Sequence, residues 1–423
     1  MSHRRLFLKQ LASLGAVAGL GSLAAAEEAL ASGLDRLAAE PRRRLGAEYL
    51  LDPGVVYLNH GSIGTIPRLV HQAHVAYLRL CERNPWLYMW GGEWEEPREQ
   101  VRIKAAGVLG ARPDEVALTH NTTEGFNILA QGLSLGPGDE VLFSSLNHDG
   151  ASVCWEHQAA ARGYEVRRFD FPVGEVSGMS VEDVVAVHAR QIRDHTRVLV
   201  FPHVDNILGL RHPMRELTRM AHRRGVEYVA VDGAQTVGMV PVDVADGGVD
   251  FYAASPHKWI QAPKGLGLLY VREQVQERVR PMWVTWGQER WAGTVRAFED
   301  YGTRNLPELL AMGDAIDFQE RLAGGDRAAR YRRLWEGWRA AVDAEPRIHW
   351  RSPTSWELSA SLFALEVEGV QSRDLSRRLY EEGGFVFRPF HTQGLNTARI
   401  SPNLATTDRE RDRFLEAAGR MAR

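Results

Sequence analysis

An aspartate and a lysine follow two short apolar runs of the kind found in buried strands. Asp232 comes directly after Tyr228–Val231, and Lys258 lies 26 residues later, just beyond the run Phe251–Ala254. A lysine amine can form an imine with an aldehyde. A carboxylate beside a pyridine nitrogen keeps the ring protonated, so that the ring accepts electrons when a bond at an amino-acid α-carbon breaks. The pair suggests pyridoxal phosphate (PLP) as cofactor, with a structural ion pair as the alternative.

A second group of polar residues could hold the phosphate of such a cofactor. The run Val116–Thr119 leads through Asn121, Thr122 and Thr123 into a helical pattern. Free N–H groups and hydroxyls at a helix N-terminus form a ready phosphate site, although Thr and Asn are also ordinary N-caps. Ser255 and His257 stand beside the lysine and favour the cofactor interpretation over the ion pair.

The elements that must position these residues alternate between strand and helix. Helical stretches such as Met214–Arg224 separate several buried-strand runs, which predicts a mostly parallel sheet with ligands at the carboxyl ends of its strands. The pattern changes after Pro307, where a long helical region to about Ala344 precedes three further strands and two helices. The strands are expected at Val116–Thr119, Glu140–Phe143, Val198–Phe201, Val226–Val231, Val249–Ala253, Leu362–Val367, Phe385–Arg388 and Ala398–Ser401, and the helices at Arg373–Glu382 and Asp408–Met421.

Length and composition fit a globular protein of two or three domains. The chain has 423 residues, 44% of them hydrophobic, and a formal net charge of −3. The balanced charge argues against a nucleic-acid-binding surface, and two cysteines are too few for a disulfide framework. We predict a signal peptide over 1–26, an N-terminal arm over 27–64, a large cofactor domain over 65–306 and a small α+β domain over 307–423.

The first residues are typical of an export signal. Arg4 and Arg5 precede an apolar run that ends in Ala24-Ala25-Ala26. This order predicts recognition by the twin-arginine translocation machinery and a periplasmic location. The run is too short to span a bilayer, so no stable membrane insertion is expected. An amphipathic N-terminal helix is the alternative. Cleavage would remove three cations and no acid, leaving a net charge of −6.

Ser255-Pro256-His257-Lys258 resembles the Schiff-base motif of the class V aminotransferase fold family of PLP enzymes, over roughly Tyr57 to Asp408. This family includes cysteine desulfurases and isopenicillin N epimerase, and the chain looks nearest the epimerase-like branch. The resemblance implies fold type I, an α/β fold with a mostly parallel seven-stranded sheet in a large domain and a small α+β C-terminal domain. It also implies a homodimer with shared active sites.

The resemblance assigns a role to each candidate residue. Lys258, Asp232 and His148 would be catalytic, with His148 stacked on the cofactor ring. Arg399 would clamp the substrate carboxylate, a task suited to guanidinium, and Asn59 would also bind substrate. The implied cofactor-binding set is Thr122, Thr123, Asn206, Asp232, Gln235, Ser255, His257, Lys258 and Thr303, in which Thr303 reaches the phosphate of the partner subunit. No metal is implied.

Departures from the family narrow the reaction. Cysteine desulfurases carry a nucleophilic cysteine shortly before the carboxylate-binding arginine, and the stretch 383–397 contains none. Desulfurase activity is therefore not expected. We expect action at the α-carbon of an amino acid or amino-acyl substrate, as a transaminase or epimerase. A PLP-dependent C–S lyase and a non-catalytic binding protein of the same fold are the alternatives.

Two tryptophan-rich segments and the export signal bear on the substrate. Trp86, Tyr88, Trp90 and Trp94 form one segment, and Trp283, Trp286 and Trp291 form the other. They are expected either to wall a site for a large or peptidic substrate or to pack in a dimer interface. The signal and the branch together are similar to periplasmic PLP enzymes that tailor the siderophore pyoverdine, which implies a peptidic siderophore precursor. An acidic substrate would need a second cation, with Arg304, Arg388 and His391 as candidates.

Overall fold

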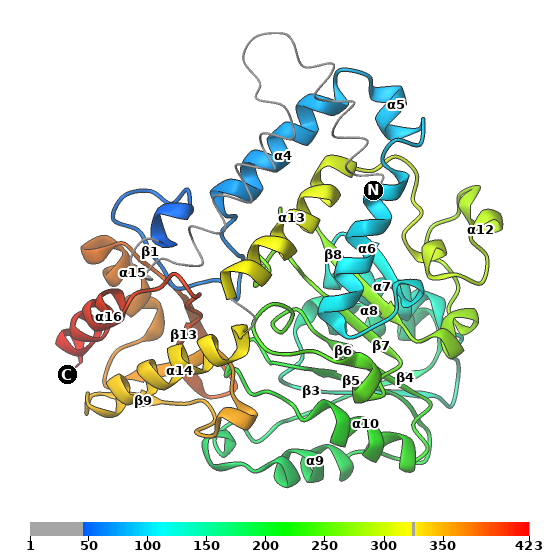
Figure 1. The fold of residues 1–423 in the computed structure, drawn as a ribbon. Helices are drawn as coiled ribbons and strands as arrows, with labels where there is room; N and C mark the ends of the chain where they lie inside the picture. Colours follow the sequence, from blue (N-terminus) through cyan, green and yellow to red (C-terminus); the bar gives the residue numbers. More distant parts are fainter. Residues whose placement is uncertain (1–44, 324–325, 423) are drawn as a thin grey trace.

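The computed structural model describes residues 45–323 and 326–422 and shows a large sheet with helices beside a smaller one (Figure 1). The predicted signal peptide and the first part of the N-terminal arm lie outside the described residues. The large sheet has seven strands in the order β2-β8-β7-β6-β5-β3-β4, and only β8 runs antiparallel to its neighbours. The bounds are β2 (Val116–Thr119), β3 (Glu140–Ser144), β4 (Glu165–Phe169), β5 (Thr196–Pro202), β6 (Tyr228–Asp232), β7 (Phe251–Ala254) and β8 (Gly267–Val271).

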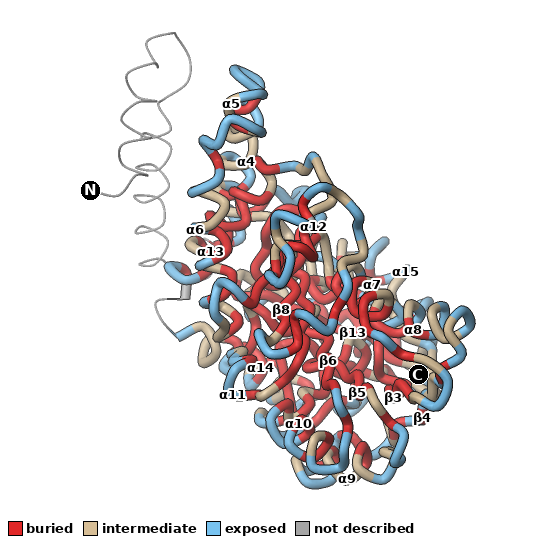
Figure 2. Tube along the Cα trace, turned by 90° about the vertical axis from the view of Figure 1, so that its right-hand side faces the viewer, coloured by how far each residue is buried: buried red, intermediate tan, exposed pale blue. Residues whose placement is uncertain are grey.

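The central strands are buried on both faces, as Figure 2 shows by the concentration of buried residues there. Successive side chains of a strand point to opposite faces, so Ala117 and Leu118 of β2 belong to two different apolar cores. Helices α7 (Thr122–Gly132) and α8 (Asp149–Arg162) contribute to one core. Helices α6 (Glu95–Leu109), α9 (Val181–Ala189) and α10 (Met214–Arg223) contribute to the other. The predicted α/β class with a mostly parallel seven-stranded sheet is confirmed.

The C-terminal part is built on a four-stranded antiparallel sheet in the order β12-β13-β10-β9. The segment β1 (Val56–Tyr57) pairs in parallel with β11 (Phe385–Val386), so residues from the N-terminal arm are hydrogen-bonded to this part of the chain. The remaining bounds are β9 (Ile348–Trp350), β10 (Phe363–Val367), β12 (Arg388–Thr392), β13 (Leu395–Ile400), α14 (Arg327–Asp343), α15 (Ser372–Gly383) and α16 (Asp408–Met421).

The two long helices after residue 305 pack in different parts of the molecule. Helix α13 (Leu306–Ala323) contacts α4 (Arg68–Cys81) and α6, whereas α14 contacts β9 and α16. The domain boundary expected after residue 306 stays a prediction. The shorter helices are η1 (Gly46–Glu48), α5 (Pro85–Met89), η2 (Pro113–Glu115), η3 (Val176–Gly178), α11 (Val244–Gly247), η4 (Glu273–Arg278), α12 (Gly287–Arg290), η5 (Val295–Phe298) and η6 (Trp356–Leu358). No described helix is long and apolar enough to cross a membrane.

The structure differs from the expected elements in a few places. The long helical region expected from residue 307 to about 344 contains two helices, α13 and α14, and Asp326 caps α14 by accepting from the Ala329 N–H at 3.1 Å. Strands β4 and β8 were not expected. Strand β4 is an edge strand whose sequence EVRRF is half exposed, so it lacks the apolar run of a buried strand. Strands β9 and β12 are further additions in the small sheet.

A buried ion pair fastens β2 to the segment that leads to Thr303. Glu299 accepts from Arg102 Nη1 and Nη2 at 2.8 and 2.7 Å and from the Leu118 N–H at 2.6 Å. Burial alone would raise the pKa of Glu299, but the charge and hydrogen bonds of Arg102 outweigh it and lower that pKa to about 2. The pair therefore stabilises the fold above the ordinary carboxyl pKa, and this contribution is lost as the pH falls toward 2.

We expect Glu299→Ala to lower the free energy of unfolding at pH 7 by about 3–5 kcal/mol, because Arg102 is left buried without its partner. Denaturant unfolding at pH 7 and pH 3 measures this, and the variant should also lose part of the acid-dependent destabilisation. Glu366→Ala is the matched control, since its pair with Arg351 is partly exposed and should contribute at most about 1 kcal/mol. Equal effects of the two substitutions would contradict the assignment.

Candidate active site

Lys258 lies in the turn after β7, at the carboxyl edge of the large sheet. The turn is closed by the Lys258 N–H, which donates to the Ser255 carbonyl oxygen at 3.0 Å. Residues of the N-terminal arm pack directly on this turn, as shown by the Gly64 N–H, which donates to the His257 carbonyl oxygen at 3.0 Å. A Cβ at Gly64 would lie 2.0 Å from the Lys258 carbonyl oxygen, so this approach requires glycine. The lysine is thereby enclosed between the sheet edge and the arm.

Asp232 ends the neighbouring strand β6 and lies opposite Ala253 of β7 in the register. One of its oxygens, Oδ1, accepts from the Ala234 N–H at 2.9 Å. Burial lowers the pKa of Lys258 to about 8, even though the negative charge of Asp232 acts in the opposite direction and the charge of Arg399 adds to the lowering. The lysine amine is therefore partly unprotonated near pH 8, the form that attacks an aldehyde or accepts a proton.

His148 is the N-cap residue of α8, with its Nδ1 accepting from the Gly150 N–H at 3.0 Å. Burial lowers the pKa of its imidazole, while the charge of Asp232 raises it and that of Lys258 lowers it, so the three groups interact electrostatically. Gly150 lets α8 start close to the N-terminus of α7, since a Cβ there would lie 2.5 Å from Thr123 Oγ1. The structure thus brings His148 to the edge that carries Lys258 and Asp232.

The residues that were expected to hold a phosphate lie at the N-terminus of α7 and beside it. Asn121 is the N-cap and accepts from the Glu124 N–H at 2.8 Å, so capping does not use the threonine hydroxyls. The Thr122 N–H lies 3.1 Å from Ser255 Oγ, and the two hydroxyl oxygens are 2.8 Å apart. A helix N-terminus with these hydroxyls is suited to a phosphate dianion.

The remaining cofactor candidates have partners within the chain. His257 Nδ1 lies 3.1 Å from the Leu266 carbonyl oxygen, and burial lowers its pKa to about 4. Gln235 donates to the Gly61 carbonyl oxygen at 2.7 Å and accepts from Trp259 Nε1 at 3.0 Å, so it fixes the arm as well as the lysine turn. The roles of His257, Gln235 and Asn206 toward a cofactor stay predictions.

Arg399 comes from β13 of the small sheet and reaches the same edge. Its Nη2 donates to Asn59 Oδ1 at 2.8 Å and to Ser62 Oγ at 2.6 Å, and its Nη1 donates to the Asn206 carbonyl oxygen at 3.0 Å. The side chain is buried, and its Nε has no hydrogen-bond partner in the described part of the chain. Burial lowers its pKa to about 9. A buried guanidinium whose hydrogen-bond partners are all neutral is suited to an incoming carboxylate.

The sequence analysis missed residues that hold this arrangement together. Ser62 supports the guanidinium of Arg399. Asp205 shapes the loop after β5 by accepting from the N–H groups of Ile207, Leu208 and Leu210 at 2.6–2.8 Å. An acid within three residues of a strand end was the available signal for Asp205, whereas Ser62 had none beyond its small size.

The β12–β13 hairpin is fastened to the loop before His148. Gln393, which has a positive φ of 52°, donates to the Ser145 carbonyl oxygen at 2.7 Å and accepts from Ser145 Oγ at 2.8 Å. The loop that precedes α8 and the sheet that carries Arg399 are therefore joined directly. The sequence analysis did not single out either residue, because they are far apart in the chain.

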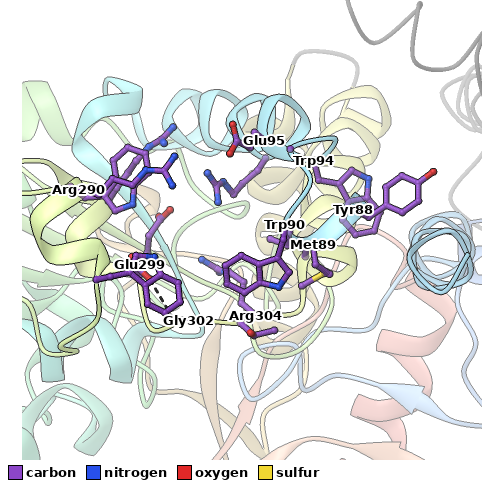
Figure 3. A pocket seen from close by; sticks show the side chains of 17 residues that line it. Tyr88, Met89, Trp90, Trp94, Glu95, Arg290, Glu299, Gly302 and Arg304 are labelled. Atoms are coloured by element: carbon purple, nitrogen blue, oxygen red, sulfur yellow. Dashed lines mark hydrogen bonds between the residues drawn. The ribbon is translucent and has the colours of Figure 1, made fainter. Parts of the chain in front are cut away.

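Thr303 lies apart from the lysine. It lines a pocket with Gly302, Trp90, Trp286 and Arg304. Figure 3 shows this pocket, in which Trp90, Gly302 and Arg304 are labelled. None of the hydrogen bonds between described residues joins Thr303 to Lys258 or Ser255. Both tryptophan-rich segments meet at this pocket, with the rings of Trp90 and Trp286 6.1 Å apart. Trp94 is buried, whereas Trp86 and Trp286 are 73% and 66% exposed. The two alternatives expected for these segments, a substrate wall and a dimer interface, stay predictions.

The two cysteines are poorly suited to nucleophilic chemistry. Burial raises the pKa of Cys154 to about 12, and it also raises that of Cys81. A thiolate is the reactive form, and a raised pKa disfavours it. The β12–β13 hairpin, which spans 388–400, carries no cysteine.

Sequence comparison decides the family. The family profile described as "Aminotransferase class-V" matches residues 56–406. The chain belongs to the class V aminotransferase family. Isopenicillin N epimerases from Streptomyces clavuligerus and Amycolatopsis lactamdurans are each 32% identical to it, covering 87% and 88% of this chain and 95% and 96% of those proteins. A cysteine desulfurase from Haloferax volcanii is 30% identical and covers 78% of each chain.

Solved structures support the same fold. The cystine C–S lyase C-DES, in complex with its product cysteine persulfide, superposes with a TM-score of 0.78 at 24% identity, covering 87% of this chain and 98% of that one. The cysteine desulfurase CsdA from Escherichia coli has a TM-score of 0.76 at 24% identity, covering 90% and 98%. The predictions of the class V family, its epimerase-like branch, fold type I and PLP are confirmed.

The residues of this chain fit PLP chemically. Lys258 would offer an amine of lowered pKa to the cofactor aldehyde, and Asp232 would offer a carboxylate to the ring nitrogen. The hydroxyl of Thr122 at the start of α7 and the neighbouring hydroxyl of Ser255 would be suitable hydrogen-bond donors to the cofactor phosphate. These three kinds of group converge on one edge of the sheet, so the protein is a PLP-dependent enzyme of the class V family.

Proposed function

We propose that the enzyme removes the α-proton of an amino acid or amino-acyl substrate, as an epimerase or a transaminase. One observation carries this proposal. Lys258, whose pKa is lowered to about 8, lies close enough to Asp232 and to the buried Arg399 to interact with both electrostatically. The names of the 32%-identical epimerases support it as well. A general base works best when its pKa lies near the working pH.

The residues divide the work between binding and proton transfer. Arg399 binds the substrate α-carboxylate in bidentate fashion, while Asn59 and Ser62 fix the plane of its guanidinium. PLP, when bound, supplies the electron sink that makes the α-proton acidic. Asp232 holds a proton on the ring nitrogen, and the neutral Lys258 amine takes the α-proton to its Nζ. Where the proton returns decides between epimerisation and transamination.

Desulfurase activity is not part of the proposal, although relatives named cysteine desulfurases exist. That chemistry needs a nucleophilic thiolate near the substrate. The pKa of each cysteine is raised by burial, and the β12–β13 hairpin, which includes Arg399, carries no cysteine. Elimination by a C–S lyase requires no cysteine and remains an outcome of the test below.

The test is to incubate the holoenzyme in D₂O with a panel of amino acids, including cystine and glutamyl peptides. Loss of the α-proton signal in NMR is the expected result. Loss of optical purity along with exchange indicates an epimerase, and conversion of the cofactor to its amine form indicates a transaminase. Release of pyruvate, ammonia and cysteine persulfide from cystine indicates a C–S lyase. Absence of exchange with every substrate would contradict the proposal.

We propose further that the enzyme is exported through the twin-arginine pathway and acts in the periplasm on a peptidic siderophore precursor. The paired Arg4 and Arg5 before an apolar run support export. In cell fractionation the native chain should appear in the periplasm, and a variant with Arg4→Lys and Arg5→Lys should stay in the cytoplasm. Equal periplasmic amounts of both would contradict export by this route.

A homodimer is the proposed assembly. None of the hydrogen bonds between described residues joins Thr303 to Thr122 or Ser255 of its own chain, and Thr303 lines a pocket beside exposed tryptophans. Exposed aromatic clusters on this scale are typical of interaction surfaces, and a second copy would cover them and bring Thr303 to a neighbouring site. Light scattering of the holoenzyme should give twice the chain mass, and a monomeric active enzyme would contradict the assembly.

A further inference from the structure

The sheet face that carries Arg399 carries a second arginine. Strands β12 and β13 are antiparallel, and Arg388 pairs directly with Arg399 in their register. Directly opposed residues of an antiparallel pair project to the same face. Both guanidinium groups lie over the ring of Phe390, with their Cζ atoms 5.8 Å (Arg388) and 5.4 Å (Arg399) from the ring centroid. The face thus presents two cations that share contact with one aromatic ring.

This arrangement is electrostatically unfavourable in the protein by itself. Like charges directly opposite each other in a ladder destabilise it, and the charge of Arg388 contributes, after burial, to the lowered pKa of Arg399. No carboxylate among residues 45–323 and 326–422 forms an ion pair with Arg388, which is exposed to solvent. Two anionic groups placed on this face would remove the repulsion.

The other cations considered in the sequence analysis are less suitable. Arg304 donates to the Leu118 carbonyl oxygen at 3.0 Å and lies over the Tyr301 ring, so its guanidinium is committed to the protein. His391 is opposite Asn396, one position out of phase with Arg388 and Phe390, and therefore projects to the other face of the sheet. Arg388 is the one of the three that shares a face with Arg399.

We propose that Arg388 is a specificity-determining residue that binds a second carboxylate, carried on the substrate side chain. The substrate is then a dicarboxylic amino acid or amino-acyl group, with its α-carboxylate on Arg399 and its distal carboxylate on Arg388. Phe390 packs against the methylene groups between them. This inference rests on the proposed function, because it takes Arg399 as the α-carboxylate site.

The test compares ligands that differ only in the distal charge. Calorimetric titration of the PLP-loaded enzyme with glutarate and with glutaramate, its half-amide, measures the contribution of the second carboxylate without any reaction. Spectral titration with L-glutamate and L-glutamine repeats the comparison with complete amino acids. We expect the native enzyme to bind the diacid about 10- to 100-fold more tightly, the usual range for a charge-assisted contact.

In Arg388→Gln this preference should disappear, because the diacid loses affinity while the amide keeps it. Arg413→Gln is the matched control, since Arg413 is also exposed and lies over an aromatic ring, that of Phe385, at 5.5 Å. It should keep the native preference.

Two results would overturn the inference: equal affinity of the native enzyme for glutarate and glutaramate, or an unchanged preference in Arg388→Gln. An Arg388-dependent preference without α-proton exchange in any substrate would uphold the anion site and reject the proposed function. Exchange of the α-proton without an Arg388-dependent preference would uphold the proposed function and reject the anion site.

Discussion

Lys258→Ala is expected to abolish the absorption band of lysine-bound cofactor and to lower α-proton exchange by about 100- to 10,000-fold, the usual contribution of a general base. The reason is that Lys258 is half-buried, interacts electrostatically with Asp232, and is proposed to supply the amine both for the cofactor aldehyde and for the α-proton. The measurements are the absorption spectrum of the PLP-supplemented protein and the NMR exchange rate in D₂O.

Lys264→Ala is the control for this prediction. Lys264 lies six residues later in the same connection before β8 and is exposed to solvent. Its replacement should leave the absorption band and the exchange rate near their native values. A Lys258→Ala protein that keeps the band, or a Lys264→Ala protein that loses it, would show that the assignment of the lysine is wrong. Unfolding curves of both variants confirm that the fold is retained.

Asp232→Asn is expected to lower the α-proton exchange rate by at least about 100-fold while the cofactor still binds. The amide keeps the shape of the side chain but removes the charge that holds a proton on the ring nitrogen, and loss of one such preorganised electrostatic group costs about 100- to 1,000-fold. The rate is measured by NMR in D₂O with the cofactor saturating.

The same variant makes a pH prediction that a purely structural aspartate would not. The native apoenzyme should capture PLP with a rate that rises with pH around a midpoint near 8, because only the neutral Lys258 amine reacts. The charge of Asp232 raises this pKa, so Asp232→Asn should move the midpoint to lower pH. A native midpoint near that of a free lysine, or an unchanged midpoint in the variant, would contradict the placement of the two residues.

Much of the site could be predicted because its residues follow strands that the local sequence defines. Asp232 and Lys258 end two apolar runs, and parallel strands bring their carboxyl ends to one edge. The junction at Asn121 was equally local, with the cap and the first helical residues adjacent in sequence. Strand β4 was missed for the opposite reason, since an edge strand with exposed polar residues has no buried run to recognise.

The contacts around Arg399 were beyond such reasoning. Its guanidinium donates to Asn59, which lies 340 positions earlier in the sequence. The packing of the N-terminal arm against the rest of the chain determines which neutral groups surround the guanidinium. The pairing of Arg388 with Arg399 likewise depends on a hairpin register, and β12 itself was not expected. A one-residue shift of that register would have placed Arg388 on the other face.

The sequence by itself therefore determined the cofactor chemistry of this protein, since a lysine, an aspartate and a helix N-terminus were each marked by local strand and helix patterns. Only the tertiary structure decided what surrounds the substrate. Burial of Lys258 and Arg399 lowers their pKa values, and the opposed arginines share Phe390, because residues distant in the chain are packed together. Desolvation and the proximity of charges are properties of that packing and leave no pattern in the local sequence.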